Sequence, residues 1–553
     1  MSAIHRSMLY TLLFGAVLTG LAHAGASSAS AAPPNFLVIL ADDLGYSDIG
    51  SFGGEIETPN LDQLAAEGLR MTGFHVASTC SPTRSMLLTG TDHHLAGIAN
   101  MKELITPSQR GKPGYEGHLN DRVVTIAEVL SNNGYRTVMS GKWHLGATDA
   151  TDPYARGFSR VFTLREGGHN HFGKPGLPPA EMGGANYTED GRKVSLPEDF
   201  YSSDYFTDKL VQFLGEDRQQ PFFAYLPFTA PHWPLHAPAE TIAKYKGHYD
   251  QGWEVLLKKR LARQQALGLL PANADLSLPA TLRDWESLSD EERRRQSRKM
   301  EIYAAMVDRM DWNIGRVIQA LRDDGRLDNT VVIFLSDNGA APDTLAGMLA
   351  KVDDFAPLEE GAFEDWGSAD SMLAYGPNWA QAASAPYRLY KSTTAEGGLM
   401  SPTIIRYPGF VNAGGTDRRF ATAMDLVPTF LEMAGAQHPA KPGGKIEPVR
   451  GKSLLPLLTG DAGPVHSDSD AVGWELFGQR ALRQGDWKAT YLSEPNGPGR
   501  WALFNLARDP GEREDLAATN PQKLAALVAL WDAYAEEMGI ILEEQVVSPY
   551  TNL

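Results

Sequence analysis

One short stretch of the chain, residues 80–84 with the sequence CSPTR, combines a reactive side chain with a positive charge at helical spacing. Pro82 is typical of the first turn of a helix, where its missing N–H leaves no bond unmade, and Gly90 is typical of a helix end. Cys80 is therefore predicted at a helix N-terminus, where free N–H groups and the helix dipole favour negative charge. Arg84 follows four residues later, on the same helix face. These features together predict a site for an anion.

Cys80 is the only cysteine, so the chain cannot form an internal disulfide. A lone cysteine is more often a small buried apolar residue than a nucleophile, so residue type alone favours a structural role. However, the pattern C-x-P-x-R resembles the signature of the type I sulfatases, and the run from Ser78 to Gly90 is similar to that of bacterial arylsulfatases. The resemblance implies that a formylglycine-generating or equivalent enzyme oxidises Cys80 to Cα-formylglycine, whose hydrate attacks sulfur.

The length and net charge of the chain limit the classes of function that it can have. A chain of 553 residues can bury a large core and hold more than one structural unit. The formal net charge of −18 argues against nucleic acid as the main partner. An acidic protein that binds an anionic substrate needs a locally positive pocket, so clustered lysines, arginines or metal ligands are informative.

The N-terminus is typical of an export signal, predicted to span residues 1–31. Arg6 supplies a positive charge, Met8 to Leu21 are largely apolar, and Ala22-His23-Ala24 and Ala29-Ser30-Ala31 are both plausible cleavage sites. The alternative is a membrane anchor, but the apolar segment is short for a span. We therefore expect a periplasmic or secreted protein that is not embedded in a membrane in its mature form.

Acidic and amide side chains follow two apolar segments that are predicted to be buried strands. Asp42 and Asp43 follow residues 35–41, and Asp337 and Asn338 follow residues 331–335. Either pair alone is better explained as a solvated turn or a helix cap. In an open α/β sheet, however, ligands bind beyond the carboxyl ends of the strands, and three carboxylates with an amide suit Ca²⁺.

Four further side chains are candidates for binding or proton transfer. Lys142 and His144 follow another predicted strand and share a face if the segment is extended. His232 lies between Pro231 and Trp233 in a predicted rigid loop, and Lys391 stands alone. Individually, the lysines are better explained as solvated side chains and His144 as a hydrogen-bonded polar residue, whereas His232 is equally well explained as a turn histidine without a role.

The order of the candidates resembles the arylsulfatase order along essentially the whole mature chain. It implies that Asp42, Asp43, Asp337 and Asn338 bind Ca²⁺ together with the modified Cys80, and that Lys142, His232 and Lys391 contact a sulfate ester. It also implies that Arg84 holds the nucleophile, that Asp337 is its base, that His232 protonates the leaving oxygen, and that His144 helps restore the aldehyde. Catalysis is then mainly positioning and charge neutralisation.

Buried strands alternate with helices, which predicts an α/β protein. Two of the predicted helices are one that Thr58 caps before Pro59 and an amphipathic one from Glu301 to Arg322. The resemblance implies an alkaline-phosphatase-like fold, with a large mixed sheet sandwiched by helices and a smaller C-terminal α+β subdomain. A Gly- and Pro-rich segment places the boundary between a catalytic domain at 32–438 and a subdomain at 439–553. Residues 341–385 are predicted to be an irregular insertion that shapes substrate choice.

The function predicted from these residues is hydrolysis of aryl sulfate monoesters by a monomeric enzyme. One alternative is a phosphonate monoester or phosphodiester hydrolase that uses the same modified cysteine. A second is a non-catalytic protein that binds sulfated ligands and keeps Cys80 as a thiol. A zinc-dependent phosphatase is disfavoured because no histidine-rich ligand set is present.

Overall fold

The computed structural model describes residues 32–175, 184–272, 274–279, 281–345 and 360–542. The chain divides into two units, residues 1–33 and residues 34–553, and everything below concerns the second. The predicted signal peptide and residues 346–359 of the predicted insertion lie outside the described residues. No helix in the described ranges is long and apolar enough to cross a membrane.

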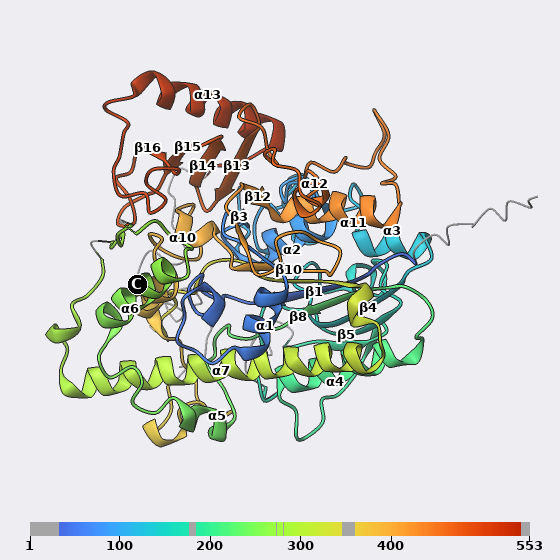
Figure 1. The fold of residues 1–553 in the computed structure, drawn as a ribbon, viewed down its shortest axis with the longest axis horizontal. Helices are drawn as coiled ribbons and strands as arrows, with labels where there is room; N and C mark the ends of the chain where they lie inside the picture. Colours follow the sequence, from blue (N-terminus) through green and yellow to red (C-terminus); the bar gives the residue numbers. More distant parts are fainter. Residues whose placement is uncertain (1–31, 176–183, 273, 280, 346–359, 543–553) are drawn as a thin grey trace, which may run out of the picture. The chain divides into compact units, whose positions relative to one another are not determined.

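A large mixed sheet forms the centre of this unit (Figure 1). Its middle strands are parallel, since β1 pairs with β8 on one side and β9 on the other, whereas β10 runs antiparallel to β9. The described strands are, in spatial order, β11 (Thr416–Asp417), β2 (Leu69–Met71), β10 (Thr403–Arg406), β9 (Thr330–Ser336), β1 (Asn35–Ala41), β8 (Phe222–Pro227), β4 (Arg136–Lys142), β5 (Arg160–Leu164), β6 (Tyr187–Glu189) and β7 (Arg192–Lys193).

Strand β1 shows why the sheet is buried on both faces. Its alternate side chains enter two different cores: Leu37 and Ile39 join one, whereas Phe36 and Val38 join the other. This is the pattern expected of a central strand whose side chains alternate between faces that are both covered.

Helices cover both faces of the sheet. Figure 1 shows α1, α4 and α7 along one side and α2, α3 and α11 along the other, in agreement with the two cores. The described helices are α1 (Pro59–Glu67), α2 (Cys80–Thr89), α3 (Ile126–Asn132), α4 (Ser202–Glu216), α5 (Ala239–Lys244), α6 (Trp253–Ala266), α7 (Asp290–Asp323), α9 (Gly376–Ala383), α10 (Glu396–Leu399), α11 (Leu426–Ala434), α12 (Leu455–Leu458) and α13 (Pro521–Met538).

A second, antiparallel sheet follows near the C-terminus. It consists of β13 (Ala471–Leu476), β14 (Gln479–Gln484), β15 (Trp487–Tyr491) and β16 (Trp501–Asn505), and α13 packs on it through Leu527 and Trp531. A small two-stranded sheet joins β3 (Phe74–His75) to β12 (Ala421–Thr422). The large mixed sheet, its helices and this C-terminal α+β unit confirm the predicted fold class. The domain boundary at 438/439 stays a prediction.

Several predicted elements differ from the observed ones in extent. Helix α7 was expected from Glu301, but it begins at Asp290 because Ser289 and Glu292 form a capping box that starts it earlier. Thr58 was expected to cap α1, yet its hydroxyl makes no cap bond and instead accepts the N–H of Gly50. The described part of the predicted irregular insertion includes a regular helix, α9.

Candidate active site

The carboxyl ends of β1 and β9 bring the acidic residues together. The two strands pair in parallel register with Ala41 opposite Ser336, so Asp42 and Asp337 emerge side by side. The backbone N–H of Asp43 donates to Asp337 Oδ1 at 3.2 Å, and Asn338 Nδ2 donates to Asp43 Oδ1 at 2.7 Å. The predicted cluster of three carboxylates and one amide is therefore assembled at one edge of the sheet, and all four side chains are fully buried.

Helix α2 presents Cys80 to this cluster. The helix begins at Cys80 after an extended Thr79 and ends at Gly90, whose φ of 68° is the left-handed conformation that glycine adopts without strain. The Cys80 thiol lies 3.8 Å from Asp43 Oδ1 and 3.5 Å from Lys391 Nζ. The predicted position at a helix N-terminus is what the structure shows.

Arg84 lies one helical turn behind Cys80 and is completely buried. Its Nε and Nη2 both donate to Asp337 Oδ2, at 3.0 and 2.7 Å, and its Nη1 donates to the Lys142 carbonyl at 2.9 Å. Charge-assisted bonds from several nitrogens of a planar guanidinium fix both groups in position.

Both candidate lysines reach the acidic cluster. Lys142, the last residue of β4, donates to the two oxygens of Asp42 at 2.9 and 2.7 Å. Lys391 donates to Asp43 Oδ1 at 2.6 Å. Three buried carboxylates thus face three buried cations around the Cys80 thiol, so the structure brings together groups that lie more than 300 residues apart in the chain.

His232 and His144 are the most exposed of the ten candidate residues, at 8% and 9%, whereas the others are 0–2% exposed. His232 follows β8, and its Nε2 lies 3.5 Å from Asp43 Oδ2 while its Nδ1 donates to the Trp233 carbonyl. The two histidines therefore lie on the solvent side of the site, where a leaving group would depart.

His144 corrects one expectation from the sequence. Its φ of 58° is left-handed, so the backbone at His144 is not extended. His144 Nε2 hydrogen-bonds Glu103 at 3.1 Å. The close approach of the chain at Gly167 helps to hold the ring, because a Cβ there would lie only 2.7 Å from the imidazole.

Glu103 is thus a site residue that the sequence reasoning missed. It lies in a single turn of 3-10 helix, Lys102–Leu104, and its side chain is 39% exposed. An acidic residue in a polar loop carries no local signal, and only the fold places it against His144.

The buried surroundings shift the pKa values of Cys80 and Asp337 in the site. Burial and the charge of Asp337 raise the pKa of the Cys80 thiol well above its usual value, although Lys142 and Lys391 act to lower it. Burial and the neighbouring Asp42 raise the pKa of Asp337 to about 6. Unmodified Cys80 is therefore a neutral thiol and a weak nucleophile at neutral pH, whereas Asp337 titrates in the range that suits a base.

The donor set fits a hard divalent cation. Burial alone would raise the pKa of Asp43, but Lys391 and His232 lower it below its ordinary range, so this carboxylate is ionised. Asp43 Oδ2 and Asn338 Oδ1 are buried and accept no hydrogen bond from the described residues. Buried oxygens without a donor, beside Asp42 and Asp337, are the ligands that Ca²⁺ or Mg²⁺ takes.

Comparison with known proteins identifies the class to which this fold and site belong. Residues 34–436 match the family model "Sulfatase", so the chain belongs to the sulfatase family. It is accordingly a sulfuric ester hydrolase with a candidate metal site. An arylsulfatase of Klebsiella aerogenes is 40% identical over 437 residues, which cover 78% of this chain and 92% of the relative. An uncharacterized sulfatase of Schizosaccharomyces pombe is 46% identical over 533 residues, which cover 92% of this chain and 94% of the relative.

Solved structures agree on the architecture. The crystal structure of Ps i-CgsB has a TM-score of 0.65 and 25% identity, and the match covers 91% of this chain and 93% of that one. A phosphonate monoester hydrolase of Agrobacterium radiobacter shares the fold alone, with a TM-score of 0.54 at 19% identity over 91% and 94% of the two chains. The alkaline-phosphatase-like fold expected from the sequence is confirmed.

Proposed function

We propose that this protein is an arylsulfatase whose nucleophile is the hydrate of a formylglycine made from Cys80, with Ca²⁺ bound beside it. The observation that carries the proposal is the position of the Cys80 thiol at the N-terminus of α2, 3.5 Å from Lys391 Nζ and next to the cluster of Asp42, Asp43 and Asp337. A neutral buried thiol is poorly suited to attack an ester, whereas a hydrated aldehyde at the same position supplies an oxygen nucleophile.

The buried charged side chains around Cys80 suit the binding of an anionic substrate. Lys142 and Lys391 are fully buried ammonium groups beside Cys80, and each can neutralise a sulfate oxygen. The three carboxylates and three cations of the protein balance, so a bound Ca²⁺ would leave the site positive and favour an anionic ester. Asp42, Asp43, Asp337 and Asn338 would hold the ion, which would polarise the nucleophile and a sulfate oxygen.

Three side chains of the site are placed to accept or donate the protons that move during the reaction. Asp337, with a pKa of about 6, would take the proton of the attacking hydroxyl, and Arg84 fixes the position of its carboxylate. His232 would donate to the departing oxygen. Burial lowers the pKa of His232 to about 3 despite Asp43, but a bound sulfate ester adds negative charge beside the ring and opposes that shift. His144, held by Glu103, would accept the proton that frees sulfate.

An aryl leaving group is supported by two observations. The Klebsiella relative is named an arylsulfatase, and the Trp233 ring lies against the His232 ring with centroids 4.9 Å apart. Ala341, the first residue of the predicted insertion, and Tyr375 within it line a cavity of about 10 Å³ together with Asp43 and Trp233. The insertion therefore borders the site and is placed to influence substrate choice.

The remaining proposals concern the protein's surroundings. We propose that the chain is exported through its N-terminal segment, acts as a periplasmic or secreted monomer, and is modified at Cys80 during maturation. The proposed site residues, the bound Ca²⁺ and the modification of Cys80 form one proposal, because each is needed for the proposed function of the others.

Parallel rate measurements on 4-nitrophenyl sulfate, 4-nitrophenyl phosphate and a phenylphosphonate monoester test the proposal. The sulfate ester is expected to have the highest kcat/KM, and treatment with a calcium chelator should lower it until Ca²⁺ is restored. A preference for the phosphonate ester would favour the alternative hydrolase. No turnover of any ester by protein from its own host that keeps Cys80 as an unmodified thiol would favour a ligand-binding role.

A further inference from the structure

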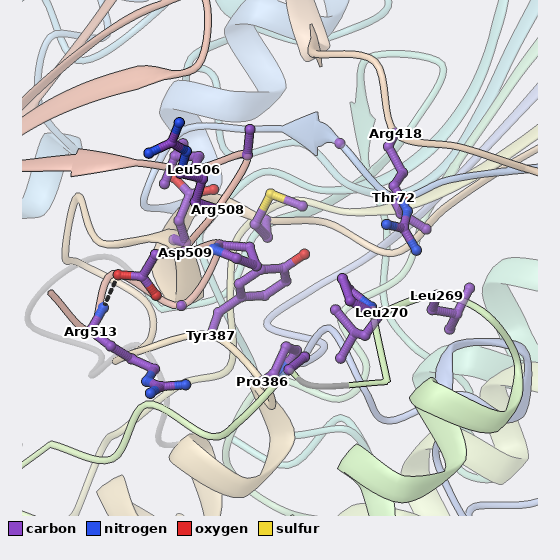
Figure 2. A pocket seen from close by; sticks show the side chains of 18 of the residues that line it. Thr72, Leu269, Leu270, Pro386, Tyr387, Arg418, Leu506, Arg508, Asp509 and Arg513 are labelled. Carbon is purple, nitrogen blue, oxygen red and sulfur yellow. Dashed lines mark hydrogen bonds between the residues drawn. The ribbon is translucent and has the colours of Figure 1, made fainter.

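A second cavity, of about 390 Å³, lies between the C-terminal sheet unit and the main domain (Figure 2). None of the ten candidate active-site residues lines it. Its walls come from the segment after α6, from residues 386–400, and from residues 506–513 after β16. A volume in this range is typical of sites for small organic molecules.

The cavity has an apolar part built around one aromatic ring. Figure 2 shows Tyr387 in the middle, with Leu269 and Arg418 on one side and Leu506, Arg508 and Asp509 on the other. Leu270, Pro386 and Met400 add to the apolar lining. A flat ring of a ligand would find both a stacking partner and aliphatic contacts here.

Two arginines place positive charge at the hydroxyl end of that ring. Arg418 and Arg483 both line the cavity and both interact electrostatically with the Tyr387 phenol. Arg418 donates to the Gly268 carbonyl. Arg483 donates to the Gly485 carbonyl, its Nη1 lies 3.4 Å from His75 Nε2, and its guanidinium lies over the Phe420 ring. Within the described residues neither guanidinium forms an ion pair, so several of their N–H groups remain available to a ligand.

The carboxylates that line the cavity are largely engaged elsewhere. Glu396 accepts from Lys488 at 2.6 Å and from His75, and Asp509 accepts the backbone N–H of Arg513. Asp275 lies 3.8 Å from Arg513, and Asp486 is exposed. Glu396 and Asp486 both act electrostatically on Arg483, whereas Arg418 forms no ion pair within the described residues, so the uncompensated positive charge near Tyr387 is that of Arg418.

We infer that this cavity is a second ligand site, which binds an organic anion with a flat ring on Tyr387 and a sulfo or carboxylate group on Arg418 and Arg483. Planar guanidinium groups suit such oxyanions because each can donate two parallel hydrogen bonds. The site is separate from the catalytic cluster, and the inference does not depend on the reaction that the cluster performs.

Calorimetric titration of the full-length protein with naphthalene-2-sulfonate, which cannot be hydrolysed, tests the inference. Arg418→Gln, a change at an exposed side chain, is expected to weaken one binding event by about tenfold. Arg483→Lys, which keeps the charge but removes the planar fork, should weaken the same event less. Neutral 2-naphthol should bind that site at least about tenfold more weakly than the sulfonate.

The controls separate this site from the catalytic one. Arg122→Gln, at an arginine paired with Glu447 on the surface, should leave binding unchanged. Binding that persists in Lys391→Ala but is lost in Arg418→Gln supports the second site, even if the chain hydrolyses no sulfate ester. Binding that Lys391→Ala removes and Arg418→Gln leaves intact, or equal affinity for 2-naphthol, would overturn it. A preference between the sulfonate and 2-naphthoate would identify the anionic group.

Discussion

Arg84 Nε and Nη2 both donate to the same oxygen of Asp337, at 3.0 and 2.7 Å, inside a fully buried site. The pair links α2, which carries Cys80, to the end of β9, which carries the proposed base and metal ligands. One guanidinium therefore links the helix that carries the proposed nucleophile to the proposed base.

Arg84→Lys tests this link. Lysine keeps the charge but cannot donate from two nitrogens to Asp337 and from a third to the Lys142 carbonyl, so kcat/KM for 4-nitrophenyl sulfate should fall about 100-fold. Arg122→Lys, at a surface ion pair with Glu447, is the matched control and should retain full activity. A loss of less than about twofold in correctly folded Arg84→Lys would show that the fork geometry is unimportant.

Glu103 is expected to be a positioning residue that acts through His144. Glu103→Ala removes the 3.1 Å contact and should lower kcat about tenfold with little change in KM, because the ring is no longer held. Glu103→Asp or Glu103→Gln should recover part of the rate if the hydrogen bond is what matters. A change confined to KM would instead assign Glu103 to substrate binding.

His232→Ala should affect substrates with poor leaving groups most. A general acid contributes more as the phenol becomes more basic, so the loss in kcat should grow along a series from 4-nitrophenyl sulfate to phenyl sulfate. His248→Ala, at an exposed histidine, serves as the control. The same fractional loss for every ester would remove His232 from the acid role.

His94 predicts a pH-dependent stability outside the active site. Its two ring nitrogens lie 2.8 Å from Asp92 and 3.3 Å from Glu475, and these carboxylates outweigh burial and raise its pKa to about 9. Because the folded pKa lies above the unfolded value, the stabilisation is complete below about pH 6.5 and is lost as the pH rises through 9; it amounts to about 3 kcal/mol.

Urea unfolding of the wild type and His94→Gln at pH 6.5 and pH 9.5 checks this expectation. The free energy of unfolding should differ between the two proteins at pH 6.5, and the difference should shrink at pH 9.5. A difference that is independent of pH would mean that His94 is neutral in the folded protein.

The sequence predicted the parts of the site that lie at the ends of regular elements. Asp42, Asp43, Asp337 and Asn338 follow apolar strands, and Cys80 stands between a helix start and Gly90, so local patterns were sufficient to place them. The fold class followed from the same alternation of strands and helices.

The remaining features depend on tertiary structure. The left-handed conformation of His144 and its contact with Glu103 follow from the packing of loops that are distant in the chain, and no residue pattern encodes them. The early start of α7 was missed because its first turns are polar and exposed, so the capping box at Ser289 was the only signal.

The mass of the peptide that contains residue 80, isolated from active protein made in its own host, is the decisive test of the proposed nucleophile. We expect an aldehyde or its hydrate in place of the Cys80 thiol. An unmodified thiol in protein that turns over sulfate esters would contradict it, because the nucleophile would then have to be a different group.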